Sequence, residues 1–129
     1  MNYLKGIPFT LMAVILVTGL SACSQDRQPN TDSEEISAIM FKNPDCKCCD
    51  KWAVYLEQHG FSVSVETPDN MQAVKMANNI PYTMGSCHTA LIGDYVVEGH
   101  VPQEAIRKLL DEQPDAAGIA VPGMPIGSP

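Results

Sequence analysis

The sequence predicts one α/β domain with the element order β-α-β-α-β-β-α. Three observations predict it: a segment with helical periodicity lies between two strand-like segments, Gly93-Asp94 joins two further β-prone runs, and an amphipathic segment follows them. Without a predicted 22-residue leader, 107 residues remain, which is enough for one compact domain and too few for two. We therefore expect a single folded unit at residues 34–112.

The first half of this domain is predicted to contain a strand, a helix and a strand. The mostly apolar residues 36–41 are typical of a strand buried on both faces. A turn signal at residues 43–45 ends this strand. Apolar and aromatic residues then recur at helical spacing until Gly60, so we expect a helix from about residue 48 or 49 to residue 59. Residues 61–65 alternate apolar and polar side chains, which indicates a second strand.

The second half is predicted to contain a short helix, a hairpin and a last helix. The short helix covers residues 71–78, and the hairpin strands are residues 89–92 and 95–97. Pro102 suits the first turn of the last helix. With a right-handed crossover between the first two parallel strands, this order is the minimal thioredoxin-like arrangement. Residues 113–129 are rich in Pro, Gly and Ala, and we expect no regular structure in this C-terminal extension.

The N-terminal residues are typical of an exported protein. Lys5 precedes an apolar run over residues 7–20 that is shorter and more lightly flanked than is typical of a membrane-spanning helix. The run ends in Leu20-Ser21-Ala22-Cys23, which resembles the processing site of bacterial lipoproteins. We therefore expect residues 1–22 to be a lipoprotein signal peptide and Cys23 to be acylated. An ordinary signal peptide cleaved near Ala22 and a retained membrane anchor are the alternatives.

The next segment is predicted to connect the lipid to the fold. Residues 23–33 are polar, include Pro29 and lack apolar periodicity, as in a flexible tether. Ser24, directly after the acylated cysteine, resembles lipoproteins that are sorted to the outer membrane. We expect a periplasmic domain held at a membrane by its lipid anchor.

The charge of the chain excludes several functions. Without the leader, 7 basic and 15 acidic residues give a net charge of −8. An acidic chain without basic clusters argues against nucleic acid as a partner and is compatible with cations. No Ser-His-Asp constellation, phosphate loop or paired-carboxylate arrangement is evident, which argues against hydrolytic and phosphoryl chemistry.

We expect the protein to be a monomer.

Three cysteines lie at the predicted junction of the first strand and the first helix. The positive end of the helix would lower the thiol pKa values of Cys46, Cys48 and Cys49. Cys46 and Cys49 form a C-x-x-C pair of the kind that exchanges disulfides, but the third thiol would invite scrambled pairings. Three sulfurs within four residues instead suit a soft metal ion, and Cu(I) is favoured by thiolates. Bridging thiolates could hold more than one ion.

A second segment supplies further candidate ligands. Cys87-His88 precedes the third strand, and in this architecture that loop faces the N-terminus of the first helix. We therefore expect Cys87, and with it His88, near the first three cysteines. Two alternatives stay open for the four cysteines: a pair of disulfides or a tetrahedral zinc site. His100 before the last helix and Met124 in the extension are weaker ligand candidates.

Four motifs resemble the CopG-type proteins of bacterial copper resistance. They are Cys46-Lys47-Cys48-Cys49, Ser86-Cys87-His88-Thr89-Ala90, Val97-Glu98-Gly99-His100-Val101-Pro102 and Gly123-Met124-Pro125. The resemblance runs from about residue 36 to the end and implies a thioredoxin-like domain with a metal-binding C-terminal extension. It also implies a periplasmic, cysteine-bridged, multinuclear copper cluster that interconverts Cu(I) and Cu(II) before export by an efflux system.

The resemblance implies a set of site residues as well. Cys46, Cys48, Cys49 and Cys87 match the ligand cysteines, and the further candidates are His88, His100 and Met124. The family pattern continues past the Gly-Ser-Pro at which this sequence stops. If Pro129 is the genuine C-terminus, we expect any ligand from that later segment to be absent.

Three functions remain open at this point. The first is copper binding with redox capability, which would make the protein a copper oxidoreductase. The second is thiol-disulfide exchange by the C-x-x-C pair, and the third is a copper chaperone or buffer without redox activity. Thioredoxins proper place a cis-proline just before the third strand, where Cys87-His88-Thr89 lies here. This difference favours copper over disulfide exchange.

Overall fold

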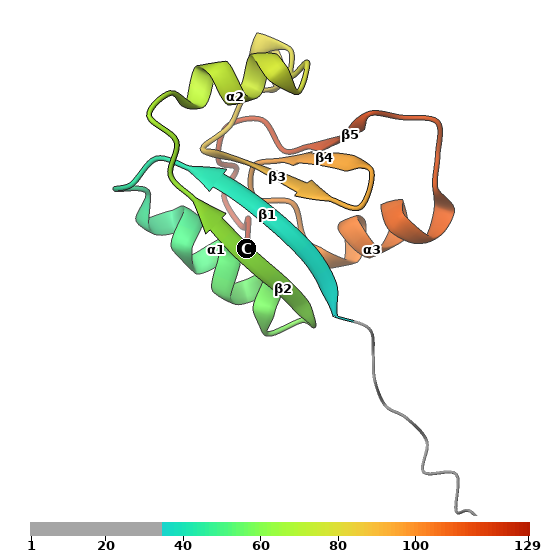
Figure 1. Ribbon diagram of the computed structural model, residues 1–129. Helices are drawn as coiled ribbons and strands as arrows, with labels where there is room; N and C mark the ends of the chain where they lie inside the picture. The colour runs from blue at the N-terminus through green and yellow to red at the C-terminus, as the bar shows by residue number, and fades with distance from the viewer. Residues whose placement is uncertain (1–34) are drawn as a thin grey trace, which may run out of the picture. The chain divides into compact units, whose positions relative to one another are not determined.

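The structure is a computed structural model that describes residues 35–129 (Figure 1). The predicted signal peptide, the predicted lipidation site Cys23 and the predicted tether up to residue 33 lie outside the described residues. Within residues 35–129, no helix is long and apolar enough to cross a membrane.

Five strands form one mixed sheet in the order β2-β1-β3-β4-β5. β1 (Ile36–Lys42) runs parallel to β2 (Phe61–Glu66) and antiparallel to β3 (His88–Ile92). β4 (Tyr95–Glu98) is antiparallel to β3, and β5 (Gly118–Ala120) is parallel to β4. The two-residue connection between β3 and β4 confirms the predicted hairpin. The domain therefore has the predicted thioredoxin-like α/β fold.

Three α-helices accompany the sheet: α1 (Lys47–Glu57), α2 (Met71–Ala77) and α3 (Gln103–Glu112). A 3-10 helix, η1 (Tyr82–Met84), lies in the loop before β3. Buried residues of α1 and α3 join the same core cluster as those of the central strands, and α2 lies on the other side of the sheet (Figure 1). The sheet is therefore covered by α1 and α3 on one side and by α2 on the other.

The prediction that β1 is buried on both faces is wrong. Ala38 and Met40 are buried, whereas Ser37 and Ile39 on the other face are exposed, with 42% of Ile39 accessible to solvent. The physical reason is the shortness of α2, whose seven residues cover only one end of that face. The strand is thus half buried, although its outer face carries an apolar side chain.

The prediction that residues 113–129 lack regular structure is also wrong in part. Gly118–Ala120 forms the edge strand β5, in which Gly118 pairs with Val96 and Ala120 with Glu98. A Cβ atom on Gly118 would lie 1.8 Å from the main-chain oxygen of Val96, so only glycine permits this approach. The Val121 N–H then donates to the Glu98 carbonyl at 2.9 Å. The extension is therefore fixed to the end of β4, next to the predicted site.

Candidate metal centre

Three distant segments meet at one end of the sheet. β1 ends there and leads into the N-terminus of α1, and the antiparallel β3 begins there, so that Lys42 pairs with His88. β4 ends at the same place because it is antiparallel to β3, and the Gly99 N–H donates to the His88 carbonyl at 3.0 Å. The topology therefore brings together the cysteines of α1, the residues before and at the start of β3, and His100.

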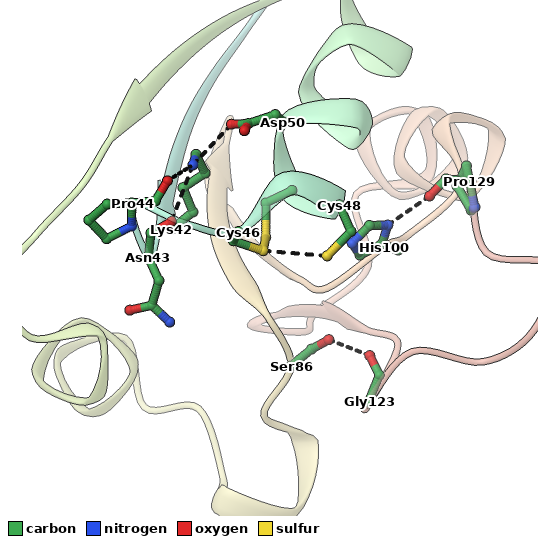
Figure 2. The surroundings of a disulfide bond; sticks show 11 residues. Lys42, Asn43, Pro44, Cys46, Cys48, Asp50, Ser86, His100, Gly123 and Pro129 are labelled. Atoms are coloured by element: carbon green, nitrogen blue, oxygen red, sulfur yellow. Dashed lines mark hydrogen bonds and ion pairs between the residues drawn. A yellow bond between two sulfur atoms is a disulfide. The ribbon is translucent and has the colours of Figure 1, made fainter.

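A disulfide lies at the start of α1, between the residue that precedes the helix and a residue of its first turn. Cys46 and Cys49 are bonded to each other, with their Cα atoms 5.4 Å apart, and the Sγ atoms of Cys46 and Cys48 are separated by 3.4 Å (Figure 2). Cys48 and Cys87 are free, half-buried thiols. The alternative with two disulfides among the four cysteines does not hold, because residues 35–129 contain this one bridge and two free thiols.

Cysteine and histidine side chains form three overlapping groups of potential metal ligands. In each group the ligand atoms all lie within 4.8 Å of one another. The groups are Cys46/Cys48/Cys49, Cys48/Cys87/His100 and Cys49/His88/His100. Figure 2 shows the side chains of Cys48 and His100 next to each other beside the disulfide. Met124, the ligand candidate in the C-terminal extension, is exposed, with 51% of its surface accessible to solvent.

The two histidines of these groups are buried polar residues. His88 has no accessible surface and His100 only 2%. Both ring nitrogens of His88 and Nε2 of His100 have no hydrogen-bond partner within the described part of the chain. A buried polar group without a partner is costly and calls for a ligand. The donor set of thiols and imidazoles is the one that soft and borderline metal ions prefer, so the residues present fit a metal ion.

Each histidine ring is held in place by a neighbour. His100 Nδ1 lies 2.7 Å from the main-chain oxygen of Pro129 (Figure 2). If Nδ1 carries the proton of this hydrogen bond, Nε2 keeps a lone pair for a metal. The His88 ring packs on Trp52 with a centroid distance of 4.3 Å, and the Trp52 indole N–H donates to the Val101 carbonyl at 3.0 Å. These contacts orient both rings before any ion arrives.

Burial sets the protonation of two candidate ligands. It lowers the pKa of His88 to about 3, and the nearby charges of His100 and Lys75 act in the same direction. His88 is therefore neutral at pH 7, which is the form that binds metals. Burial also raises the pKa of the Cys87 thiol, and the neighbouring Cys48 adds to this effect. Cys87 would consequently release a proton when it binds a metal ion.

A buried lysine fixes the loop that leads to the cysteines. Lys42 Nζ donates to the carbonyl oxygens of Asn43 and Pro44 at 3.2 and 3.0 Å, and it forms an ion pair with Asp50 at 3.0 Å (Figure 2). Asp50 lies in the first turn of α1. Lys42 thus joins the end of β1 to the helix that carries Cys48 and Cys49.

A buried glutamate, Glu98, fixes the segment that carries Cys87 and His88. Glu98 accepts hydrogen bonds from the Ser86 N–H and the Thr89 hydroxyl, each at 2.6 Å, and forms an ion pair with Lys75 of α2. The two donors flank the candidate ligands in sequence. Sequence reasoning assigned Glu98 no role, although an acid at the end of the otherwise apolar β4 was a usable signal.

The C-terminal extension packs against the same segment. The Ser86 hydroxyl donates to the Gly123 carbonyl at 2.5 Å (Figure 2), and the Gly123 N–H lies 3.4 Å from the Gly85 carbonyl oxygen. Gly99 has a φ of +79°, and a Cβ atom on it would come within 2.5 Å of the Ser86 hydroxyl. The extension therefore passes beside Cys87, and Met124 is the next residue after this contact.

The fold and the site define a class of protein: a thioredoxin-like domain whose reactive end carries cysteine and histidine groups able to hold a metal ion. The chain is similar to two solved structures with the titles "Copper resistance protein copG- Form 2" and "Copper resistance protein copG- Form 1". The match to each structure has 46% sequence identity and covers 74% of this chain. It covers 77% of the Form 2 chain with a TM-score of 0.71, and 76% of the Form 1 chain with a TM-score of 0.70. The chain belongs to the CopG family of copper resistance proteins.

Two further comparisons accompany this result. Residues 84–129 match a family described as "Protein of unknown function, DUF411". This range includes Cys87, His88, His100 and Met124. No curated protein sequence matches the chain.

Proposed function

We propose that this domain binds copper as Cu(I), with thiolates and imidazoles from both segments as ligands. The observation that carries the proposal is the convergence of Cys48, Cys87 and His100, which come from three parts of the fold. The names of the two similar structures support copper as the ion, and the sulfur-rich donor set supports its monovalent state. Zinc is the alternative ion for the same ligands.

We further propose that the reduced protein converts Cu(II) to Cu(I). In this step the thiolates of Cys46 and Cys49 lose one electron each and form the S–S bond, while two Cu(II) ions gain one electron each. The disulfide between these residues supports the proposal, because it is the oxidised product that the step requires. With three or four thiolates available before oxidation, the site has enough bridging ligands for more than one ion.

Thiol-disulfide exchange is the second candidate function. It is favoured by the same Cys46–Cys49 disulfide, which lies at the N-terminus of α1. The Cys48 sulfur, only 3.4 Å from that of Cys46, argues against it because a third thiol competes for the disulfide. A chaperone that carries copper without changing its valence is consistent with the same ligands.

The setting of this function is also a proposal. The lipoprotein-type N-terminus supports a periplasmic domain anchored to the outer membrane, and a disulfide suits an oxidising compartment. We propose that the domain acts there as a monomer and passes Cu(I) to an efflux system.

Anaerobic copper loading tests the main proposal. The fully reduced protein is loaded with Cu(I), dialysed against a chelator of moderate affinity and analysed for metal, with Zn(II) as the competing ion. We expect copper to be retained and zinc to be displaced, and Cys48→Ser to lower the amount of copper. His59→Gln, at the far end of α1, is the matched control and should retain the wild-type amount. A wild-type protein that holds no copper would contradict the proposal.

The redox step has its own measurement. Cu(II) added to the reduced protein should lose its electron paramagnetic resonance signal while two thiols disappear per two ions reduced. If the Cu(II) resonance signal persists and all thiols stay intact, the protein does not reduce Cu(II), and a role as a chaperone without redox activity remains. Turnover of insulin disulfides at a thioredoxin-like rate without copper would favour the second candidate function.

A further inference from the structure

We infer that the protein keeps a smaller metal site after Cys46 and Cys49 have been oxidised, formed by Cys48, Cys87 and His100 and suited to one Cu(I) ion. The inference rests on the proposed copper function and concerns the redox state that this structure contains. The inference follows from the ligands that are lost when the disulfide forms.

The disulfide affects the three ligand groups unequally. A disulfide sulfur is not a thiolate, and the thiolate is the metal ligand. The group Cys46/Cys48/Cys49 is left with a single thiolate, and the group Cys49/His88/His100 loses its one thiolate. The group Cys48/Cys87/His100 loses nothing, because both of its cysteines are free.

The remaining group has the geometry of a site. Its two sulfurs and one ring nitrogen lie within 4.8 Å of one another. Cys48 and Cys87 are only half buried, so an ion can reach them from solvent, whereas the Nε2 atom of His100 is buried without a partner among the described residues. That orphaned nitrogen is an observation independent of the cysteines, and a bound ion would satisfy it.

Each ligand of this group is held by contacts that the disulfide does not change. His100 Nδ1 is hydrogen-bonded to the main-chain oxygen of Pro129, and the N–H of Ser86, the residue before Cys87, donates to the buried carboxylate of Glu98. Cys48 lies in the first turn of α1. A site whose ligands are already oriented loses little conformational entropy on binding, so three ligands suffice for useful affinity.

The donor set selects the ion. Two thiolates and one imidazole match a soft monovalent ion such as Cu(I), for which thiolate ligands are preferred. A structural zinc site normally has four protein ligands, whereas this group offers three, because oxidation removes the thiolates of Cys46 and Cys49. Binding one Cu(I) replaces the two thiol protons, which are released to solvent.

The consequence is a difference in copper capacity between two redox states. The reduced protein can use the thiolates of Cys46 and Cys49 in addition to the smaller group, whereas the oxidised protein retains one Cu(I) at Cys48/Cys87/His100. Oxidation by Cu(II) would therefore expel all but one of the Cu(I) ions that the reduced site holds.

A double variant tests the smaller site without relying on oxidation. Cys46→Ser/Cys49→Ser lacks both thiols and cannot form the disulfide. Under anaerobic Cu(I) titration against a chromogenic chelator, we expect one equivalent bound. Adding Cys87→Ser or His100→Gln should weaken binding by about tenfold or more, whereas adding His59→Gln should not change it.

The wild-type protein provides a second arm that needs no substitution. Protein purified without reductant, with two free thiols, is titrated with Ag(I), a monovalent ion that does not reduce the disulfide. We expect one equivalent, against more than one for the fully reduced protein.

The outcomes separate the two proposals. If reduced wild type binds Cu(I) but neither the double variant nor the oxidised protein binds an ion, the inference is wrong and the copper function stands. Binding by the double variant that survives both Cys87→Ser and His100→Gln also overturns the inference. If the reduced wild type binds nothing, both proposals fail.

Discussion

The imidazole rings of His88 and His100 lie with their centroids 5.1 Å apart at an angle of 61°. Both rings are buried, and Trp52 contacts the first of them. Three of their four ring nitrogens have no partner within residues 35–129. A small domain can tolerate such a polar pair in its core if a ligand satisfies the nitrogens, so the pair marks the inner side of the proposed copper site.

The buried His88 predicts how the stability of the metal-free protein depends on pH. Because the pKa of His88 is lowered from 6.5 to about 3 in the folded state, only the unfolded chain binds a proton at this residue between these values. The contribution of neutral His88 is therefore complete above pH 6.5 and is lost as the pH falls towards 3. The slope for one proton is about 1.4 kcal/mol per pH unit.

Urea unfolding of wild type and His88→Gln at pH 7, 6, 5 and 4 checks this prediction. The comparison cancels the carboxylates that titrate in both proteins. We expect the wild type to lose stability more steeply than the variant below about pH 6. Parallel curves for the two proteins would show that His88 is not buried in its neutral form.

The single tryptophan should report metal binding. The rings of Trp52 and His88 pack together with their centroids 4.3 Å apart. An ion bound to the imidazole of His88 therefore changes the surroundings of the Trp52 indole. Anaerobic Cu(I) addition to the reduced protein should quench the emission of Trp52 in step with binding. His88→Gln should reduce the quenching while bound copper is still measured, and unchanged emission on saturation of the wild type would contradict the placement of His88 at the site.

The Lys75–Glu98 ion pair should contribute strongly to stability. Glu98 is 2% exposed and Lys75 13%, so Glu98→Gln leaves a largely buried ammonium without its partner. Loss of one member of such a pair costs about 3 kcal/mol, measured by urea unfolding. Lys108→Met removes the exposed Lys108–Glu112 pair and should change stability by less than about 0.5 kcal/mol. Equal effects of the two substitutions would refute the structural role of Glu98.

Two glycines with positive φ should differ in their tolerance of alanine. Gly99 and Gly123 have φ values of +79° and +68°, but a Cβ atom would clash with Ser86 and Val121 only at Gly99. Gly123→Ala should cost about 1 kcal/mol from backbone strain alone. Gly99→Ala should cost clearly more, and it should also lower copper retention because it displaces the segment before Cys87. Thermal unfolding of both variants measures the difference, and similar losses would argue against the Ser86 contact.

The order of elements and the approach of Cys87 to α1 were accessible from the sequence. Alternating side chains locate β2, helical spacing locates α1 and α3, and the Gly93-Asp94 connection locates the hairpin of β3 and β4. The antiparallel hairpin then fixes which ends of the strands meet. Cysteine spacing gave the candidate ligands, because three thiols within four residues suit a soft metal ion better than a disulfide exchanger, which needs only two.

Other features depend on tertiary contacts that no local pattern encodes. β5 has only three residues, and the sequence Gly-Ile-Ala becomes a strand because it pairs with β4. The choice of Cys46–Cys49 as the bonded pair, with Cys48 left free, depends on side-chain directions at the start of α1. The role of Glu98 depends on its contacts with Lys75, Ser86 and Thr89, which lie 9 to 23 residues away in the chain.

Copper content and ligation of Cys87→Ser test the central claim most directly, because this claim requires sulfur from two distant segments in one site. Reduced wild type and variant are loaded with Cu(I) anaerobically, and copper K-edge X-ray absorption counts the sulfur neighbours of the retained metal. We predict that Cys87→Ser retains less copper, with fewer sulfur neighbours per ion. A variant with the wild-type copper content, sulfur count and affinity would show that Cys87 is not a ligand and would contradict the account.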